Sequence, residues 1–277
     1  KRRPSGNRRS GQYVEQGELI ARIDALRLDL PDYRQTLESL IHDQTPVPDY
    51  DGKSAFILFR QNFDHRAIGP YDADDLCEDI PDAASNCRLV GGGQIVAVDG
   101  EPGNHELAIT LHEGTYASNA GAKTYMQIPT LEGEEYTELH LSYRVRFGQG
   151  FDWGSTGGKL PGFGGYASGV TDAQHATTST RLIEVDMGFT ARHMFRQEGG
   201  AESYLHHQNQ LSNPGAGDHD TWWFQSQPFQ FKTQTSYLIE QRVKINTPKS
   251  AVSDGQDGII EMWVNGIQVY KRQNLTL

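Results

Sequence analysis

The sequence has few cysteines and no long apolar run, and each absence excludes a class of protein. Only two of its 277 residues are cysteine, so the fold cannot depend on a dense framework of disulfides. It does not need one, because a chain of this length can bury a sizeable apolar core. No run of about 18 apolar residues occurs, which argues against a membrane-spanning helix. We therefore expect no membrane partner.

Basic residues are also in the minority. The chain has 25 Lys and Arg residues against 36 Asp and Glu residues, which gives a net charge of −11 at pH 7. Domains that bind nucleic acids are normally basic, so we expect no nucleic-acid partner. An acidic polymer is still compatible with this charge if one groove is locally basic, because a local potential can oppose the net charge.

The two cysteines, Cys77 and Cys87, lie ten residues apart in an acidic segment that contains proline. This turn-rich setting favours a disulfide between them over two free thiols. A disulfide indicates an oxidising compartment, so we expect a secreted or periplasmic protein. The aspartates of "YDADDL" (71–76) lack the spacing of a calcium-binding loop, and we predict a solvated loop there.

The first 52 residues differ in pattern from the rest of the chain. Residues 1–12 are basic, and a later stripe of apolar residues at helical spacing consists of Leu19, Ile23, Leu26 and Leu30. The segment "TPVPDYDG" (45–52) is typical of a linker. We therefore predict a basic tail with a short α-helical extension over residues 1–52, and a main domain over residues 53–277.

The main domain has the pattern of an antiparallel β protein. Residues 138–147 and 236–245 alternate between apolar and polar side chains, as expected for half-buried strands. Residues 258–272 predict a hairpin with Asn265-Gly266 at its turn. Roughly a dozen short strands with glycine-rich turns predict an all-β fold, an antiparallel β-sandwich of the jelly-roll type. We expect one concave sheet to form a groove for substrate.

Two neighbouring segments place polar side chains on one predicted sheet face. In "GFTARHMFRQ" (188–197), strand alternation puts Thr190, Arg192 and Arg196 on one face, and His193 with its apolar neighbours on the core side. In "SYLHHQ" (203–208), the residues that share a face are Tyr204, His206 and Gln208. If the two segments form a hairpin, a phenol, an imidazole and guanidinium groups line the same surface.

Further basic residues could join this surface. The stretch "GGKLPGFGG" (157–165) holds Lys159 among glycines and a proline, and we predict a loop there. Its lysine is either solvated in a surface turn or a cation that the loop delivers to the groove. On residues 138–147, Arg144 and Arg146 fall on the polar face and are candidates for binding an acidic substrate.

This set of residues suits one reaction better than the others. It has no pair of carboxylates for glycoside hydrolysis and no nucleophile beside a base for acyl transfer. It does suit β-elimination at a uronic acid, where cations stabilise charge that develops on the carboxylate and Tyr or His moves protons. Hydrolysis stays open as an alternative, because Glu184 and Asp186 alternate on one predicted strand.

Three segments together resemble a known family. "GGKLPGFGG", "FTARHMFR" and "AESYLHH" are similar to segments of the alginate lyases of polysaccharide lyase family 14, and the first is shared with the related glucuronan lyases of family 20. The resemblance covers about residues 136–270. It implies a β-jelly roll with a cleft for an acidic polysaccharide and β-elimination without a metal or another cofactor.

The resemblance also implies roles for individual residues. Lys159 matches the family's essential lysine, and Thr190 and Arg192 match a Ser/Thr-x-Arg pair that lines the cleft. Tyr204 matches the first tyrosine of a Tyr-x-Tyr pair, whereas the second position here is His206, a departure from the pattern.

We accordingly predict catalytic roles for four residues. Lys159 and Arg192 neutralise the substrate carboxylate, and Tyr204 and His206 share the proton transfers. Predicted substrate contacts are Thr190, Arg196, Gln208, Arg144 and Arg146. The prediction is a monomeric alginate lyase, with a glucuronan lyase or a non-catalytic polyuronate-binding module as the alternatives.

Overall fold

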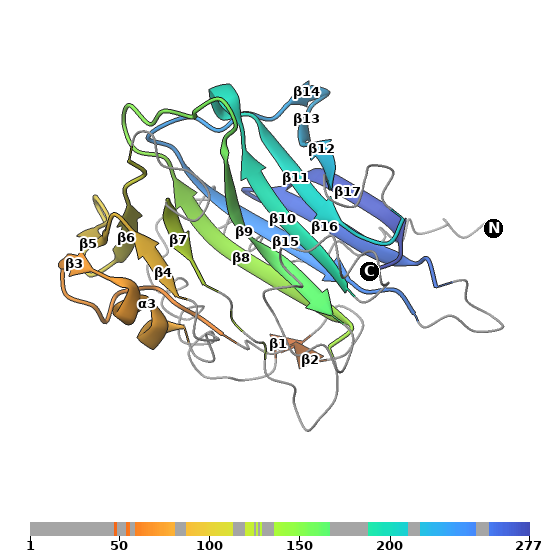
Figure 1. Ribbon diagram of the computed structural model, residues 1–277, viewed down its shortest axis with the longest axis horizontal. Helices are drawn as coiled ribbons and strands as arrows, with labels where there is room; N and C mark the ends of the chain where they lie inside the picture. The colour runs from red at the N-terminus through yellow and green to blue at the C-terminus, as the bar shows by residue number, and fades with distance from the viewer. Residues whose placement is uncertain are drawn as a thin grey trace, which may run out of the picture. The chain divides into compact units, whose positions relative to one another are not determined.

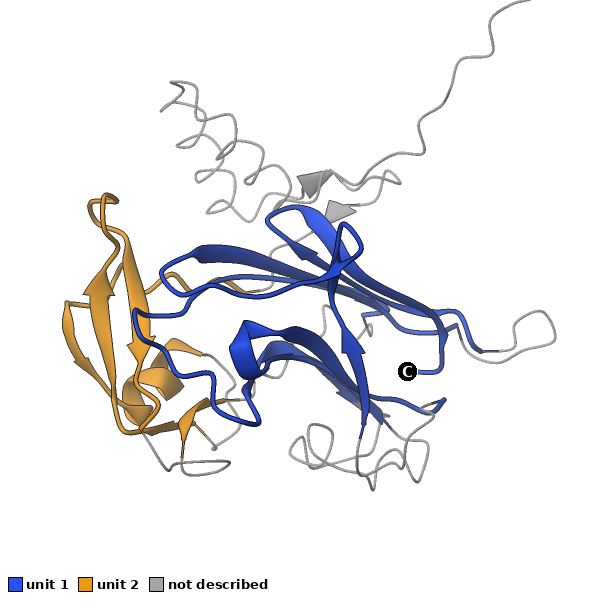
Figure 2. Ribbon diagram, turned by 90° about the horizontal axis from the view of Figure 1, so that it is seen from above, with its two compact units in different colours: residues 1–56, 135–277 blue, residues 57–134 orange. Residues whose placement is uncertain are grey.

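The computed structural model describes most of the chain after residue 58. The described residues are 59–80, 87–112, 120–124, 126, 128, 136–166, 188–209, 217–247 and 255–277, with the short strands β1 (Val47–Pro48) and β2 (Ser54–Ala55). The chain divides into two compact units, one formed by Lys1–Phe56 with Glu135–Leu277 and the other by Ile57–Glu134 (Figure 2). Apart from β1, the predicted helical extension over residues 1–52 lies outside the described residues, and its boundary stays a prediction.

The first unit contains two four-stranded antiparallel sheets. The first sheet has the order β12-β11-β10-β9 and the second the order β17-β16-β15-β8. The strands of the first are β9 (Gly158–Tyr166), β10 (Gly188–Phe195), β11 (Ala201–His206) and β12 (Asp218–Thr221). Those of the second are β8 (Glu138–Arg146), β15 (Ser236–Lys244), β16 (Gly258–Val264) and β17 (Ile267–Leu275).

These two sheets lie over each other as layers (Figures 1 and 2), which confirms the predicted all-β sandwich. The predicted hairpin is present between β16 and β17. Asn265 and Gly266 both have positive φ, 50° and 75°, as a two-residue hairpin turn requires. A short pair, β13 (Trp223–Phe224) and β14 (Gln227–Pro228), follows β12.

The core of the sandwich is filled from the inner faces of both sheets. One cluster is rich in aromatic residues, among them Phe147, Phe195, Trp222, Phe231 and Tyr237, and a second contains Phe189, Leu205, Val243 and Ile260. In the aromatic stretch 221–231, Trp222 and Phe231 are buried, whereas Trp223 is 53% exposed. The side chain of Trp222 donates a hydrogen bond from Nε1 to Ser203 Oγ at 2.9 Å. Filling of the core therefore explains most of this stretch.

His193 lies on the core side of β10, as strand alternation predicts, and is fully buried. Loss of solvation disfavours the charged imidazole and lowers the pKa of His193 to about 3. The unfolded chain, with an ordinary histidine pKa near 6.5, therefore binds more protons than the folded chain between about pH 6.5 and pH 3. The stability that depends on neutral His193 is present above pH 6.5 and is lost as the pH falls.

We expect acidification from pH 7.5 to pH 5 to lower the free energy of unfolding by about 2 kcal/mol through His193 alone. A His193→Leu variant, which has no imidazole to protonate, should lose less stability over this interval than the wild type. Denaturant unfolding at the two pH values measures the difference. Because burial also lowers the pKa of His207, the variant should keep part of the acid sensitivity. Equal losses in both proteins would contradict this account of His193.

The second unit combines a helix with short strands. Its three-stranded sheet consists of β3 (Gly69–Tyr71), β5 (Gly93–Ala97) and β6 (His105–Ile109), and β4 (Arg88–Val90) pairs with β7 (Gly121–Lys123).

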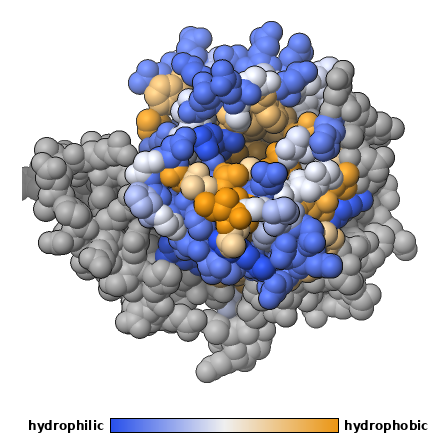
Figure 3. All heavy atoms as spheres, turned by 90° about the vertical axis from the view of Figure 1, so that its left-hand side faces the viewer, coloured by the Kyte–Doolittle hydropathy of each residue, from blue (hydrophilic) through white to orange (hydrophobic). Residues whose placement is uncertain are grey.

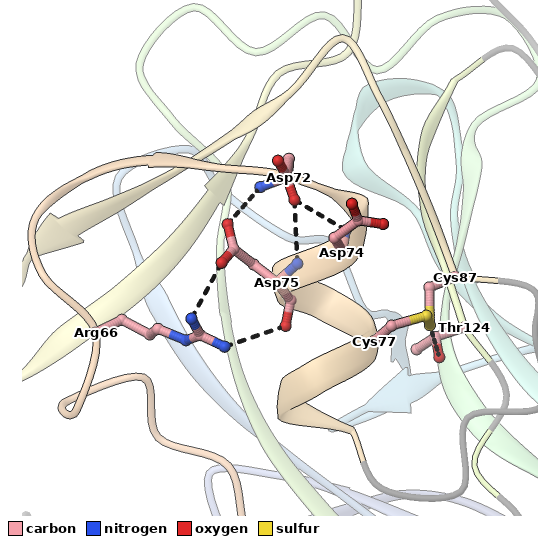
Figure 4. The surroundings of a disulfide bond; sticks show 7 residues. All are labelled: Arg66, Asp72, Asp74, Asp75, Cys77, Cys87 and Thr124. Carbon is pink, nitrogen blue, oxygen red and sulfur yellow. Dashed lines mark hydrogen bonds and ion pairs between the residues drawn. A yellow bond between two sulfur atoms is a disulfide. The ribbon is translucent and has the colours of Figure 1, made fainter.

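The prediction of a solvated loop at residues 71–76 is wrong, because α3 (Ala73–Asp79) begins there. Asp72 accepts hydrogen bonds from the backbone N–H groups of Asp74 and Asp75, and the Asp75 carboxylate accepts one from Asp72 N–H. This capping box starts the helix (Figure 4).

The predicted disulfide is present and joins α3 to the segment before β4. Cys77 and Cys87 are bonded, with their Cα atoms 5.5 Å apart (Figure 4). Arg66 holds the same helix from the other side, through ion pairs with Asp75, Glu78 and Asp79. The second unit has a small core of its own, in which Tyr71, Leu76 and Ile95 are buried.

We expect replacement of both cysteines by serine to lower the free energy of unfolding of this unit by about 2–3 kcal/mol, because the crosslink restricts the unfolded chain over a loop of about ten residues. Denaturant unfolding without a reductant measures the loss. Adding a reductant should destabilise the wild type and leave the double variant unchanged. A double variant as stable as the oxidised wild type would show that the bond contributes nothing.

Large apolar side chains also reach the surface of the second unit. Ile68, Ile109 and Leu111 are exposed, and Figure 3 shows apolar side chains among hydrophilic ones on the face that it views. Exposed apolar residues interspersed in this way are normal for a protein surface. Within the described residues, no helix has the length and apolar character needed to cross a membrane.

Candidate active site

The predicted hairpin of β10 and β11 is present and brings the predicted residues together. Arg192 lies directly opposite Tyr204, and Thr190 lies opposite His206. Paired residues of antiparallel strands point to the same side of the sheet. The opposite side of both strands faces the core, where Phe189, Ala191 and Leu205 are buried. The four polar residues therefore share the outer face of the first sheet, which we call the site face.

Lys159 also reaches the site face, although not from a loop. The prediction of a loop at residues 157–165 is wrong, because Gly158–Tyr166 form strand β9. Pro161 is tolerated there for two reasons: β9 is an edge strand, and its register with β10 shifts between Ala191 and His193. The pairing sets Lys159 opposite Met194, two positions along β10 from Arg192.

Glycines in β9 and just before it allow the strand to approach β10 closely. A Cβ atom on Gly157 would collide with the backbone carbonyl oxygen of Phe195, and one on Gly162 would collide with that of Ala191. Gly157 also has a positive φ of 71°, which a side chain would strain. The glycine-rich sequence is therefore required by backbone packing, and it places the Lys159 side chain on the site face.

Tyr204 lies at the centre of the residues on this face. The Nζ atom of Lys159 is 5.4 Å from the centroid of the Tyr204 ring, and the Cζ atom of Arg192 is 5.3 Å from it. These distances are typical of cations held against an aromatic face. The ring of His206 stands edge-on to Tyr204, with centroids 4.9 Å apart. The other three predicted catalytic residues thus all lie against the phenol ring of Tyr204.

Two predicted substrate contacts carry polar atoms without a partner among the described residues. Thr190 is buried, and its Oγ1 atom makes no hydrogen bond there. Gln208 donates from Nε2 to the carbonyl oxygen of Gly188 at 3.0 Å, while its Oε1 atom has no partner. Since an unsatisfied buried polar group is costly, such atoms are typical of sites that a ligand completes.

Arg196 is on the site face, but its guanidinium is engaged by protein groups. It donates from Nε to Glu202 Oε1 at 2.7 Å and from Nη1 to the carbonyl oxygen of Thr156 at 2.5 Å. Its Nη2 atom lies 2.9 Å from Nδ1 of His219. These contacts favour a role in holding the site together over the predicted contact with substrate.

Arg144 and Arg146 do not reach the site face. Both belong to β8, a strand of the second sheet, where they alternate with the core-facing Tyr143 and Val145. Their side chains therefore lie on the outer side of the second sheet, on the other side of the core from Tyr204. Alternation correctly predicts that they point away from the core, but it does not tell which of the two sheets carries them.

Two further residues of the site face, His219 and Glu202, are not among the predicted site residues. The His219 ring lies 4.7 Å from the Tyr204 ring, at 30° to it, and its Nδ1 atom is 2.6 Å from Glu202 Oε1. Glu202 follows the alternation of Tyr204 and His206 on β11, so the pattern could have included it. His219 comes from β12, a strand of four residues whose place beside β11 has no local signal in the sequence.

The described residues form no cluster of three or more His, Cys, Asp or Glu side chains that could hold a metal ion. Besides the Glu202 carboxylate, which Arg196 and His219 bind, the site face offers cations, a phenol and imidazoles. Such groups can bind an anionic ligand and move protons on it.

The fold is similar to that of solved alginate lyases. The structure of alginate lyase Aly36B is 22% identical, with 78% of each chain covered and a TM-score of 0.55. A variant of that enzyme in complex with alginate tetrasaccharide is 22% identical over 77% of this chain and 81% of the other, with a TM-score of 0.56. At this identity the likeness shows the β-sandwich fold alone.

No curated protein matches the sequence. The family model described as Polysaccharide lyase 14 matches residues 100–277, which is more than half of the chain and includes the whole site face. The chain therefore belongs to polysaccharide lyase family 14, a family of lyase enzymes.

Proposed function

We propose that this protein is an alginate lyase and that the site face of β9–β12 is its active site. The observation that carries the proposal is the convergence of Lys159 and Arg192, from two different strands, on the ring of Tyr204. Two cations beside a phenol provide what an anionic sugar needs: charge neutralisation and a group that transfers protons. Alginate is favoured because similar solved structures are named alginate lyases, two of them in complex with alginate oligosaccharides.

In the proposed reaction, Arg192 and Lys159 bind the carboxylate of the uronate at the cleavage point. Removal of the C5 proton puts negative charge on this carboxylate, and the two cations stabilise it as it develops. The electron pair of the C5–H bond forms the C4–C5 double bond, and the bond from C4 to the glycosidic oxygen breaks. The leaving oxygen gains a proton, so the products are one new sugar end and one 4,5-unsaturated uronate.

Tyr204 and His206 are the groups proposed for the two proton transfers. Their rings are in edge-to-face contact, so one bound sugar can reach both. Thr190 and Gln208 are proposed to bind the sugar through Oγ1 and Oε1, the polar atoms that lack partners among the described residues. A hydroxyl and an amide oxygen are suited to hydrogen bonds with sugar hydroxyls.

The site face favours elimination over hydrolysis. Glu202 supplies a carboxylate on this face, and it is bound by both Arg196 and His219. Hydrolysis with two acids needs a pair of carboxyl groups on either side of the glycosidic bond. Glu184 and Asp186, the pair that the sequence offers for hydrolysis, lie outside the described residues.

The test is to incubate the protein with polymannuronate, polyguluronate and glucuronan and to follow the ultraviolet absorbance of the unsaturated uronate. We expect the absorbance to rise with at least one of the two alginate blocks. A rise with glucuronan alone would show a glucuronan lyase instead. New reducing ends without this absorbance would show a hydrolase, and binding with neither signal would show a non-catalytic module.

We also propose that the protein works in an oxidising compartment, outside the cell or in a periplasm. The Cys77–Cys87 disulfide supports this, because such bonds persist mainly where thiols are not kept reduced. Protein isolated from its native compartment without a reductant should resist thiol alkylation. Alkylation of both cysteines in that sample would contradict the proposal.

A further inference from the structure

Three charged or polar side chains form a network beside Tyr204. Glu202 on β11 accepts hydrogen bonds from Arg196, and its Oε1 atom also lies 2.6 Å from Nδ1 of His219 on β12. The Glu202 side chain is 15% exposed, against 30% for Arg196 and 41% for His219, so the carboxylate is the least exposed member. A carboxylate removed from water in this way needs its partners, which holds the three side chains together.

For a neutral imidazole, the contacts favour one of the two positions of its proton. Arg196 has only donors and an ionised Glu202 has only acceptors, yet both lie within hydrogen-bond distance of His219 Nδ1. If Nδ1 accepted a hydrogen bond from Arg196, its lone pair would face the carboxylate oxygen at 2.6 Å, which is repulsive. If Nδ1–H donates to Glu202 instead, Arg196 and His219 share Glu202 Oε1 as acceptor. The second arrangement satisfies all three groups and fixes the orientation of the His219 ring.

The fixed imidazole lies against Tyr204. Its ring is 4.7 Å from the phenol ring, at 30°, and His219 and Tyr204 are directly opposite each other in the pairing of β11 with β12. Lys159, Arg192 and His206 contact the same phenol ring. His219 is therefore one of the groups that determine where the Tyr204 hydroxyl can lie.

The network also reaches the segment just before β9, the strand that carries Lys159. Arg196 Nη1 donates to the carbonyl oxygen of Thr156, which lies three residues before Lys159 and just before β9 begins. One guanidinium thus connects the start of β9 with the carboxylate that holds His219. The network therefore contacts both the segment that leads into the strand of Lys159 and the histidine that lies against Tyr204.

We propose that His219 is a positioning residue for Tyr204, held in one orientation by Glu202 and Arg196. This inference rests on the proposed function, because it assigns the network to the same reaction. Catalytic groups must be held close to their productive geometry, and a displacement of about 1 Å can reduce the rate about 100-fold. The role of the network is to limit the motion of the phenol between the imidazole and the two cations.

The test compares His219→Ala, which removes the ring, with His219→Phe, which keeps a ring against Tyr204 but cannot bond to Glu202. We expect His219→Ala to lower kcat about 10- to 100-fold and to change KM less than about 3-fold, because it affects the geometry of the reaction and not the binding of substrate. His219→Phe should recover only part of the lost kcat, because it keeps a ring against Tyr204 but loses the hold of Glu202 on that ring. Glu202→Gln should lower kcat to a similar level, because it weakens the same hold.

The matched control is His140→Ala, which removes the histidine of another His–Glu pair. His140 lies on the outer side of the second sheet, with Nε2 3.3 Å from Glu138 Oε1, and its loss should leave kcat unchanged. Thermal unfolding of every variant identifies any that fails to fold. If His219→Ala does not fold, the comparison of His219→Phe with the wild type still tests the proposal.

Three results would overturn the proposal. A folded His219→Ala protein with kcat within about 2-fold of the wild type would show that Tyr204 does not need this contact. A raised KM at unchanged kcat would make His219 a substrate contact. A His219→Phe protein as slow as His219→Ala, beside a Glu202→Gln protein as fast as the wild type, would mean that the imidazole itself takes part in the chemistry. If the wild type forms no unsaturated product, the proposed function fails. If the wild type is active and the His219 variants are equally active, only the positioning role of His219 fails.

Discussion

Replacing Lys159 with alanine is expected to lower kcat on alginate about 100- to 1000-fold, the loss typical when one group that stabilises developing charge is removed. The Lys159 ammonium lies 5.4 Å from the centre of the Tyr204 ring. In the proposed reaction, the carboxylate of the uronate binds beside this ammonium. The fold should be unaffected, because Lys159 is exposed and the close contacts of β9 are made by its glycines. Initial rates of unsaturated-uronate formation measure the effect.

A suitable control is Lys271→Ala. Lys271 is also a strand lysine, but it belongs to the second sheet, where it forms an ion pair with Glu261 at 2.8 Å. Its loss should leave the rate unchanged. A Lys159→Ala protein with full activity would refute the assignment of the site face, whatever the substrate proves to be.

Replacing Tyr204 with phenylalanine is expected to lower kcat about 100- to 10,000-fold, the usual contribution of a positioned group that transfers a proton. The variant removes only the hydroxyl, so the ring keeps its contacts with Lys159, Arg192 and His219. KM should change little, because the carboxylate of the substrate is bound by the cations. Steady-state kinetics on defined oligosaccharides separate kcat from KM.

Tyr143→Phe is the matched control for this variant. The Tyr143 hydroxyl is buried and has no hydrogen-bond partner among the described residues, so removing it should cost the fold nothing and leave the activity unchanged. If Tyr204→Phe keeps the wild-type kcat, the proton transfers do not use the phenol, and His206 becomes the first candidate for both.

Strand alternation alone predicted which side chains of β10 share a face. It assigned Arg192 and Thr190 to one face of β10 and His193 to the core, and the structure confirms both assignments. The same reasoning on the next segment put Tyr204 and His206 together. A tight connection between two strongly patterned strands leaves few possible registers, which is why the hairpin could be predicted from the sequence.

The errors have physical causes as well. Glycine and proline in residues 157–165 normally indicate a turn, but an edge strand tolerates proline, and close packing on β10 requires glycine. The capping box of α3 consists of two aspartates in an acidic stretch, where a helix of seven residues has little apolar pattern to reveal it. Arg144, Arg146 and His219 could not be placed because their positions depend on which sheet a strand joins and at which edge.

The mass of the products tests the central claim most directly. Elimination adds no water, so each oligosaccharide from the new non-reducing end should be lighter by one water than the saturated oligosaccharide of the same length. We expect the wild-type protein to release such products from alginate, and the Lys159→Ala protein to release almost none in the same time. Products with the full mass of saturated oligosaccharides would show that the protein hydrolyses its substrate, and would contradict the account given for Lys159, Arg192 and Tyr204.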